Sequence, residues 1–318
     1  MQFYSLGTPV GRRRGLLALS PVVVFLVSYV VVSLILDDFY KMPVSVALLL
    51  ASMWAVVIYR GRPLAERVET FSKAAGHSSI LYMIWIFVLA GAFASLAKSI
   101  GSVEATVNLA LSVFPAGFIL PTLFFAACFI SLSIGTSVGT VVALAPFAVE
   151  IGGHGGGNVA FYVAVILGGA FFGDNLSFIS DTTIAATRSQ GCSMADKFKA
   201  NSWIVVPAAV VTLILYIMLG IDIPQLSVGG SANPWLMVPY LLVIITAVCG
   251  LNVTLVLTIG LVSALILGVF NGFGLVEMAG FIGEGIDSMG QLIIVTLMAA
   301  GMLGIIKAAG GIQYLLHV

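Results

Sequence analysis

Long apolar runs alternate with short breaks of charged residues, glycine and proline along most of the chain. A run of about 20 apolar residues matches the thickness of the hydrocarbon core of a bilayer. The pattern predicts membrane-spanning helices near residues 16–36, 42–59, 79–97, 202–220, 234–250, 251–270 and 291–306. Two less apolar stretches, 63–77 and 274–289, predict short helices at the membrane surface.

Composition makes this a membrane protein rather than a soluble one. Hydrophobic residues make up 60% of the 318 residues and charged residues 8%, whereas soluble domains carry about 25% charged residues. The mean hydropathy is +1.17. We therefore predict an all-α polytopic membrane protein, long enough for about eight or nine crossings.

Two polar interruptions disturb this pattern. The polar run 131–140 interrupts the apolar region 117–151, and the run 173–183 interrupts the region 158–200. Irregular backbone at membrane depth is tolerated only where protein encloses it or where it lines a cavity. We expect a re-entrant hairpin over 117–151 and a broken helix over 158–200.

The distribution of basic residues favours the hairpin, because cytoplasmic loops carry the excess of Lys and Arg. With a hairpin, eleven basic residues lie inside, namely Arg12, Arg13, Arg14, Arg60, Arg62, Arg67, Lys73, Arg188, Lys197, Lys199 and Lys307. Only Lys41 and Lys98 then lie outside. The alternative is a single kinked span over 117–151, which would place Arg188, Lys197 and Lys199 outside.

An internal repeat is suggested by a shift of 209 positions. The shift superimposes Gly76 on Gly285, Ser79 on Ser288, Ile84 on Ile293, Ala90 on Ala299, Lys98 on Lys307 and Gly101 on Gly310. The charge-based topology gives the two copies opposite orientations, as in many secondary transporters. We expect a first repeat over 10–222 and the start of an inverted second repeat over 223–318. The second repeat is incomplete, because the counterparts of 131–140 and 173–183 would fall after residue 318.

The hairpin tip offers oxygen ligands. Two half-helices that meet at 135–139 leave backbone carbonyls and amides without helical partners. Four hydroxyl side chains surround them: Ser133, Thr136, Ser137 and Thr140. Such hard, neutral oxygens suit a dehydrated Na⁺ or Li⁺. The alternative is that these small residues only allow close helix packing.

The break at 173–183 holds the acidic candidates. Asp174 follows an apolar run, where low-dielectric surroundings disfavour a charged carboxylate, so a proton and a metal cation can compete for it. Asp181 is either a second Na⁺ ligand or the ion-pair partner of Arg188. The expected neutral ligands or caps are Asn175, Ser177, Ser180, Thr182 and Thr183. The sequence from Asp181 to Thr183 is also typical of a helix N-terminus.

The two polar motifs carry a family resemblance. Gly-Thr-Ser-x-Gly-Thr at 135–140 and Gly-Asp-Asn-Leu-Ser-x-x-Ser-Asp-Thr-Thr at 173–183 resemble the NhaC-type Na⁺/H⁺ antiporter family of the ion-transporter superfamily, from about residue 10 onward. The resemblance implies exchange of Na⁺ for H⁺ across a bacterial inner membrane, with Asp174 and Asp181 as the acidic positions. Phe178 stands where the family motif commonly has proline. The resemblance also implies a longer chain with a second polar hairpin. Some relatives couple the ions to malate and lactate.

These features predict a multi-pass secondary antiporter and not an enzyme, with no cofactor beyond the transported ions. The expected partners are the bilayer, Na⁺ and H⁺; a homodimer is an option that no residue pattern specifies. A carrier of small carboxylates and an inactive truncated transporter are the alternatives. The chain lacks a phosphate-binding motif for ATP-driven pumping and the Gly-x-Gly-Asp signature of an intramembrane aspartyl protease. No basic face suggests a nucleic-acid partner.

Overall fold

The computed structural model describes residues 11–39, 41–113, 118–155, 158–220, 233–249 and 251–317. Over these residues the chain forms helices and no strands, which confirms the all-α prediction. Six helical stretches in this part are long and apolar enough to cross a membrane, from Arg12–Ile35 to Leu275–Ala308. The shorter apolar helices are Val44–Ile58, Ile119–Ile134 and Pro234–Ala247.

The chain divides into two compact units, residues 1–84 with 289–318 and residues 85–288. The first unit contains α1 (Arg12–Ile35), α2 (Val44–Ile58), α3 (Leu64–Ala75), α14 (Gly290–Ala308) and α15 (Gly311–His317). The boundary between the units falls within α4 (Ser78–Ser99). The second unit contains α5 (Ser102–Val113), α6 (Ile119–Ile134), α7 (Ser137–Gly155), α8 (Val159–Leu176), α9 (Asp181–Gln190), α10 (Met194–Gly220), the 3₁₀ turn η2 (Pro234–Met237), α11 (Val238–Val248), α12 (Val253–Phe270) and α13 (Leu275–Ser288).

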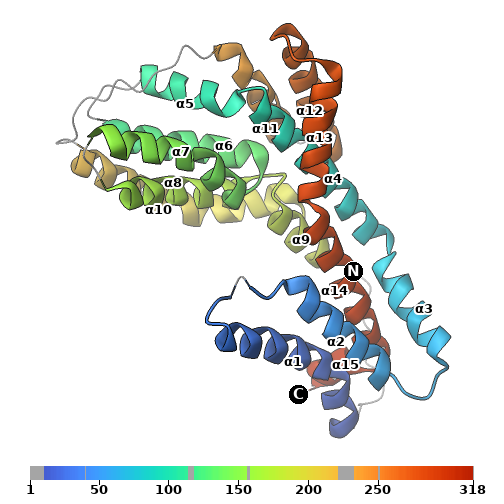
Figure 1. Cartoon of the computed structure of the whole chain (residues 1–318). Helices are drawn as coiled ribbons and strands as arrows, with labels where there is room; N and C mark the ends of the chain where they lie inside the picture. Colours follow the sequence, from blue (N-terminus) through green and yellow to red (C-terminus); the bar gives the residue numbers. More distant parts are fainter. Residues whose placement is uncertain are drawn as a thin grey trace. The chain divides into compact units, whose positions relative to one another are not determined.

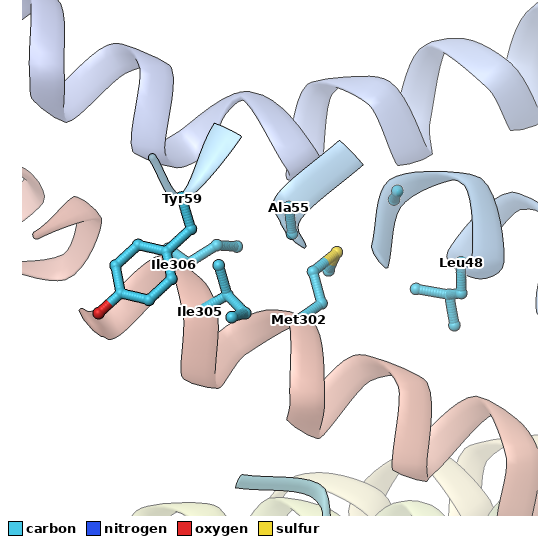
Figure 2. Close-up of a cluster of buried hydrophobic side chains, with 7 residues drawn as sticks. Leu48, Ala55, Tyr59, Met302, Ile305 and Ile306 are labelled. Atoms are coloured by element: carbon cyan, nitrogen blue, oxygen red, sulfur yellow. The ribbon is translucent and has the colours of Figure 1, made fainter. Parts of the chain in front are cut away.

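The core of the first unit lies between α2 and α14. Its buried side chains are Leu48, Ala51, Ala55, Tyr59, Met302, Ile305 and Ile306 (Figure 2). Small residues allow α3 to approach α14 closely, since a Cβ atom at Gly301 would lie 2.4 Å from the ring of Phe71. This unit carries neither of the polar interruptions.

The second unit is built around α6 and α8, which lie side by side with α7 (Figure 1). A Cβ atom at Gly169 would lie 2.5 Å from the carbonyl oxygen of Phe124, and one at Gly173 would lie 2.4 Å from that of Cys128. Two glycines four residues apart are a typical means of bringing two membrane helices into backbone contact. Ser131 adds a hydrogen bond of 2.6 Å from its Oγ to the carbonyl oxygen of Ala170.

All seven predicted spans and both predicted surface stretches are helical, but their limits differ in places. α10 begins at Met194 rather than near 202. The prediction began too late because the first two turns of this helix are polar and lack the apolar pattern. α5 was not predicted. Beside the six long stretches in the described part of the chain, the apolar sequence also forms the shorter helices α2, α6 and α11.

The predicted repeat has a local counterpart in the backbone. α4 and α14 are each followed by a glycine with positive φ, Gly101 at 96° and Gly310 at 91°. The preceding residues also match, since the amide of Ile100 donates to the carbonyl of Leu96 and the amide of Ala309 to that of Ile305. These positions are 209 residues apart in each case. The inverted orientation of the two copies and the domain limits at 222 and 223 stay predictions.

Candidate functional site

The hairpin tip is a two-residue turn between α6 and α7. Gly135 ends α6 in the left-handed conformation, with φ at 73°, and its amide donates to the carbonyl oxygen of Ser131 at 2.9 Å. Thr136 then caps α7, because its Oγ1 accepts a hydrogen bond of 3.2 Å from the amide of Gly139. α7 therefore starts with its free amides beside the turn.

The break between α8 and α9 covers residues 177–180 and touches this turn. Ser177 Oγ donates to the carbonyl oxygen of Leu132 at 2.9 Å and accepts from the amide of Ile179 at 3.2 Å. A Cβ atom at Gly135 would lie 2.8 Å from the backbone of Ile179. The two polar interruptions found in the sequence are thus in direct contact, although about 40 residues separate them along the chain.

Asp174 lies in the last turn of α8 and faces the start of α7. Its Oδ2 accepts a hydrogen bond of 2.9 Å from Ser137 Oγ. Its Oδ1 is buried and has no hydrogen-bond partner among the described residues. A buried carboxylate oxygen without a donor is unfavourable unless a proton or a cation occupies it.

A cavity of about 270 Å³ adjoins this carboxylate. The residues that line it are Asp174, Asn175, Thr182, Thr183, Ala186 and Lys197. They come from the end of α8, from the first turns of α9 and from the first turn of α10. The cavity therefore lies where α8 ends and α9 begins, beside the start of α10.

Lys197 belongs to this cavity and was missed as a site residue. Its Nζ donates to the backbone carbonyl of Asn175 and, at 2.7 Å, to Thr183 Oγ1. Asn201 also donates to the Asn175 carbonyl, at 3.3 Å. Lys197 was predicted only as one of the basic residues on the inside, because the predicted helix began near 202. A start at Met194 would have placed Lys197 in the first turn of α10, beside the break.

The other predicted ligands are arranged differently. Ser133 and Thr140 donate within their own helical segments, to the carbonyls of Phe129 and Thr136 at 2.7 Å each. Ser180 is buried and lies 3.0 Å from Thr182 Oγ1, while the Asn175 side chain donates to the carbonyl of Phe171 at 3.1 Å. Asp181 starts α9, as predicted, but its side chain, and so its role as a ligand or as partner of Arg188, lies outside the described residues.

Asp174 and Lys197 are the charged residues that line the cavity. Within the described ranges no three His, Cys, Asp or Glu side chains cluster as they would around a transition metal. The other polar residues that line the cavity are Asn175, Thr182 and Thr183, which are neutral. A carboxylate with neutral hard oxygens suits an alkali cation or a proton.

Comparison with known proteins bears on this site. Residues 15–221 match the model of the Na⁺/H⁺ antiporter family. The malate-2H⁺/Na⁺-lactate antiporter of Bacillus subtilis (strain 168) is 28% identical over 224 residues, which are 65% of this chain and 47% of that protein. The Na⁺/H⁺ antiporter NhaC of the same organism is 26% identical over 206 residues, 60% of this chain and 45% of that protein.

A third relative is the Na⁺/H⁺ antiporter NhaC of Alkalihalophilus pseudofirmus, which is 31% identical over 138 residues, 43% of this chain and 30% of that protein. The chain spans about half the length of the first two relatives. The matched family region, residues 15–221, includes the turn at 135–136, the break at 177–180 and every residue that lines the cavity.

Proposed function

The chain belongs to the Na⁺/H⁺ antiporter family, and from this premise we propose that it exchanges Na⁺, or Li⁺, for H⁺ across a bacterial inner membrane. It is a multi-pass membrane protein of a transporter family. The exchange is secondary active transport, driven by the ion gradients themselves. Asp174 is the residue on which the two ions compete.

The observation that carries this proposal is the state of the Asp174 carboxylate. Ser137 holds one oxygen, and the other is buried without a partner among the described residues. A proton on Oδ1 neutralises the group, and a Na⁺ beside Oδ1 compensates its charge. Both cannot occupy the same oxygen at once, and a buried carboxylate disfavours the empty ionised state. Such exclusive occupancy is the requirement for antiport.

The cavity supplies further oxygens for the cation. Thr183 Oγ1 and the Asn175 carbonyl lie on its wall. Asn175 belongs to the last turn of α8, whose carbonyls point beyond the helix end and carry the negative end of the helix dipole. These oxygens would complete the cation shell.

Access to the site depends on the contact between the hairpin turn and the break. Ser177 joins the break to α6 through Leu132, and Ser137 joins α7 to Asp174. A movement of the hairpin relative to α9 and α10 would change these hydrogen bonds together with the exposure of the cavity. We propose that this movement alternates access between the two sides of the membrane.

A second candidate function is transport of a small carboxylate coupled to Na⁺ or H⁺. The Lys197 ammonium and the hydroxyls of Thr182 and Thr183 line the cavity, and such groups are donors for a substrate carboxylate. The malate-2H⁺/Na⁺-lactate antiporter is among the similar proteins. The ionised Asp174 would repel an anion in the same cavity, so this function requires a protonated or cation-bound Asp174.

The proposal is tested in inverted membrane vesicles from cells without their own Na⁺/H⁺ antiporters. A preformed ΔpH is established, and Na⁺, Li⁺, K⁺ or malate is added to vesicles that contain this chain, Asp174→Asn or Asp287→Asn. Asp287 is exposed in α13 and outside the cavity, so the last variant controls for loss of a carboxylate elsewhere.

We expect Na⁺ and Li⁺ to collapse the ΔpH with the unchanged chain and with Asp287→Asn, and to have no effect with Asp174→Asn. Collapse by malate alone would favour the carboxylate carrier. No response to any addition, with correctly inserted protein, would contradict antiport by the 318-residue chain and favour the inactive alternative.

A further inference from the structure

Lys197 occupies oxygens that a transported cation would need. Its ammonium donates to the Asn175 carbonyl and to Thr183 Oγ1. A carbonyl and a hydroxyl are also the neutral ligands that a small alkali cation takes in place of water. The ammonium therefore lies where we expect part of a Na⁺ coordination shell.

Lys197 and Asp174 line the same cavity without forming an ion pair, and both side chains are within the described part of the chain. Arg62 and Lys73, by contrast, form exposed ion pairs with Glu66 and Glu69 of α3. The cavity thus separates a carboxylate oxygen without a partner from an ammonium held by neutral oxygens.

A Na⁺ in this cavity would lie close to the ammonium. Two like charges in one partly buried site repel each other more strongly than they would in bulk water. The Na⁺ can use the Asn175 carbonyl and Thr183 Oγ1 only after the ammonium has left them. The flexible four-carbon stem of lysine allows such a displacement, and its three donors can be satisfied by water or by Asp174 instead.

We infer that Lys197 is a tethered cation that competes with Na⁺ for the oxygens of the Asp174 cavity and thereby sets the Na⁺ affinity. The inference rests on the proposed function, since it requires Na⁺ to bind beside Asp174. Lys197 balances the charge of the ionised carboxylate while the cavity holds no Na⁺. When Na⁺ enters, the ammonium moves off Asn175 and Thr183.

Binding of radioactive Na⁺ to the purified full chain, at alkaline pH in detergent, tests this competition. Lys197→Gln removes the charge, and its amide can still donate to the same oxygens. We expect the half-saturating Na⁺ concentration to fall by about fivefold or more, because one like charge leaves the shared cavity. Lys197→Arg keeps the charge and should bind Na⁺ nearly as weakly as the unchanged chain.

Lys199→Gln is the matched control, because Lys199 is exposed two residues further along the same helix and does not line the cavity. It should leave the Na⁺ affinity unchanged. If the only role of Lys197 were to join α8 to α10 by hydrogen bonds, Lys197→Gln would leave the Na⁺ affinity unchanged or lower it. Either result overturns the inference. Na⁺ binding that needs Asp174 would then still support the proposed function. No binding to any variant would overturn both.

A measurement on the unchanged chain covers the case in which Lys197→Gln does not fold. The protein is treated with an amine-acylating reagent in Na⁺ or in choline, and the modified lysines are quantified by mass spectrometry. Displacement predicts that Na⁺ increases acylation of Lys197 relative to Lys199. Equal or lower acylation of Lys197 in Na⁺ would show that the ammonium keeps its two oxygens, which contradicts the competition.

Discussion

Ser137 Oγ donates a hydrogen bond of 2.9 Å to Asp174 Oδ2, across 37 positions of the sequence. It joins the first residue of α7 to the last turn of α8. The hydroxyl at the start of α7 and the carboxylate at the end of α8 are therefore directly linked. Hydrogen bonds to a charged acceptor are stronger than neutral ones, so this contact fixes the orientation of the Asp174 carboxyl group.

Ser137→Ala should weaken the competition of Na⁺ with the proton at Asp174. The variant removes a hydrogen bond to a charged acceptor, which is worth about 1.5–3 kcal/mol. The half-saturating Na⁺ concentration for ΔpH collapse should therefore rise roughly tenfold or more. Ser202→Ala is the control, since Ser202 donates to Phe198 within α10. Equal effects of the two variants would exclude a specific role for the Ser137 contact.

Gly173→Ala should separate α8 from α6. The added methyl group would meet the Cys128 carbonyl oxygen at 2.4 Å and the Leu132 amide nitrogen at 2.7 Å, and backbone atoms cannot rotate away. We expect a loss of about 1–3 kcal/mol in the free energy of unfolding, seen as a lower melting temperature in detergent.

Gly168→Ala provides the comparison for this substitution. Its Cβ would meet only the Tyr216 hydroxyl at 3.4 Å and a Phe124 ring carbon at 3.8 Å. The effect should stay within about 0.5 kcal/mol. If Gly168→Ala were as destabilising as Gly173→Ala, loss of glycine from α8, rather than the close approach, would explain both results.

Gly135→Ala should disturb both the turn and its contact with the break. A non-glycine residue in the left-handed region costs about 1–2 kcal/mol, and the new Cβ would also lie 2.8 Å from the backbone of Ile179. Both antiport and melting temperature should fall. Gly191→Ala isolates the first effect, because Gly191 has φ at 65° but nothing within 4 Å of its Cβ position. This variant should lose some stability and keep its exchange activity.

Cysteine labelling can decide between the hairpin and the single kinked span. Cys192 is exposed in the segment between α9 and α10, next to the basic residues that the hairpin topology places inside. In a Cys249→Ser background, a membrane-impermeant maleimide should label Cys192 in inverted vesicles and not in intact cells. Labelling in intact cells would favour the single span. Cys128 is buried and should stay unmodified.

The aromatic pair Phe178 and Phe198 illustrates a contact that the sequence did not predict. Their rings stack with centroids 4.9 Å apart and planes inclined by 22°. Phe178 was noted only as a departure from a proline that is common in the motif. In the fold, Phe178 of the break packs against Phe198 of α10, the residue that follows Lys197. Phenylalanine in place of proline therefore adds a packing contact beside the cavity.

The helical class, the approximate spans and the two polar interruptions could all be predicted from the amino-acid sequence. These follow from apolar run length and from the need to satisfy backbone polar groups in a membrane. The resemblance of residues 135–140 and 173–183 to an antiporter motif also needed no structure. The motifs do not indicate which hydroxyl side chain contacts Asp174.

The hydroxyl that reaches Asp174 is known only from the folded chain. Ser133 and Ser137 are four residues apart, but the left-handed Gly135 lies between them and interrupts the helical periodicity that relates their directions. Ser133 donates back within α6, and Ser137 reaches Asp174. Likewise, Lys197 enters the cavity because α10 starts earlier than its apolar pattern and packs beside the break. Such contacts depend on how helices approach one another, which no local pattern encodes.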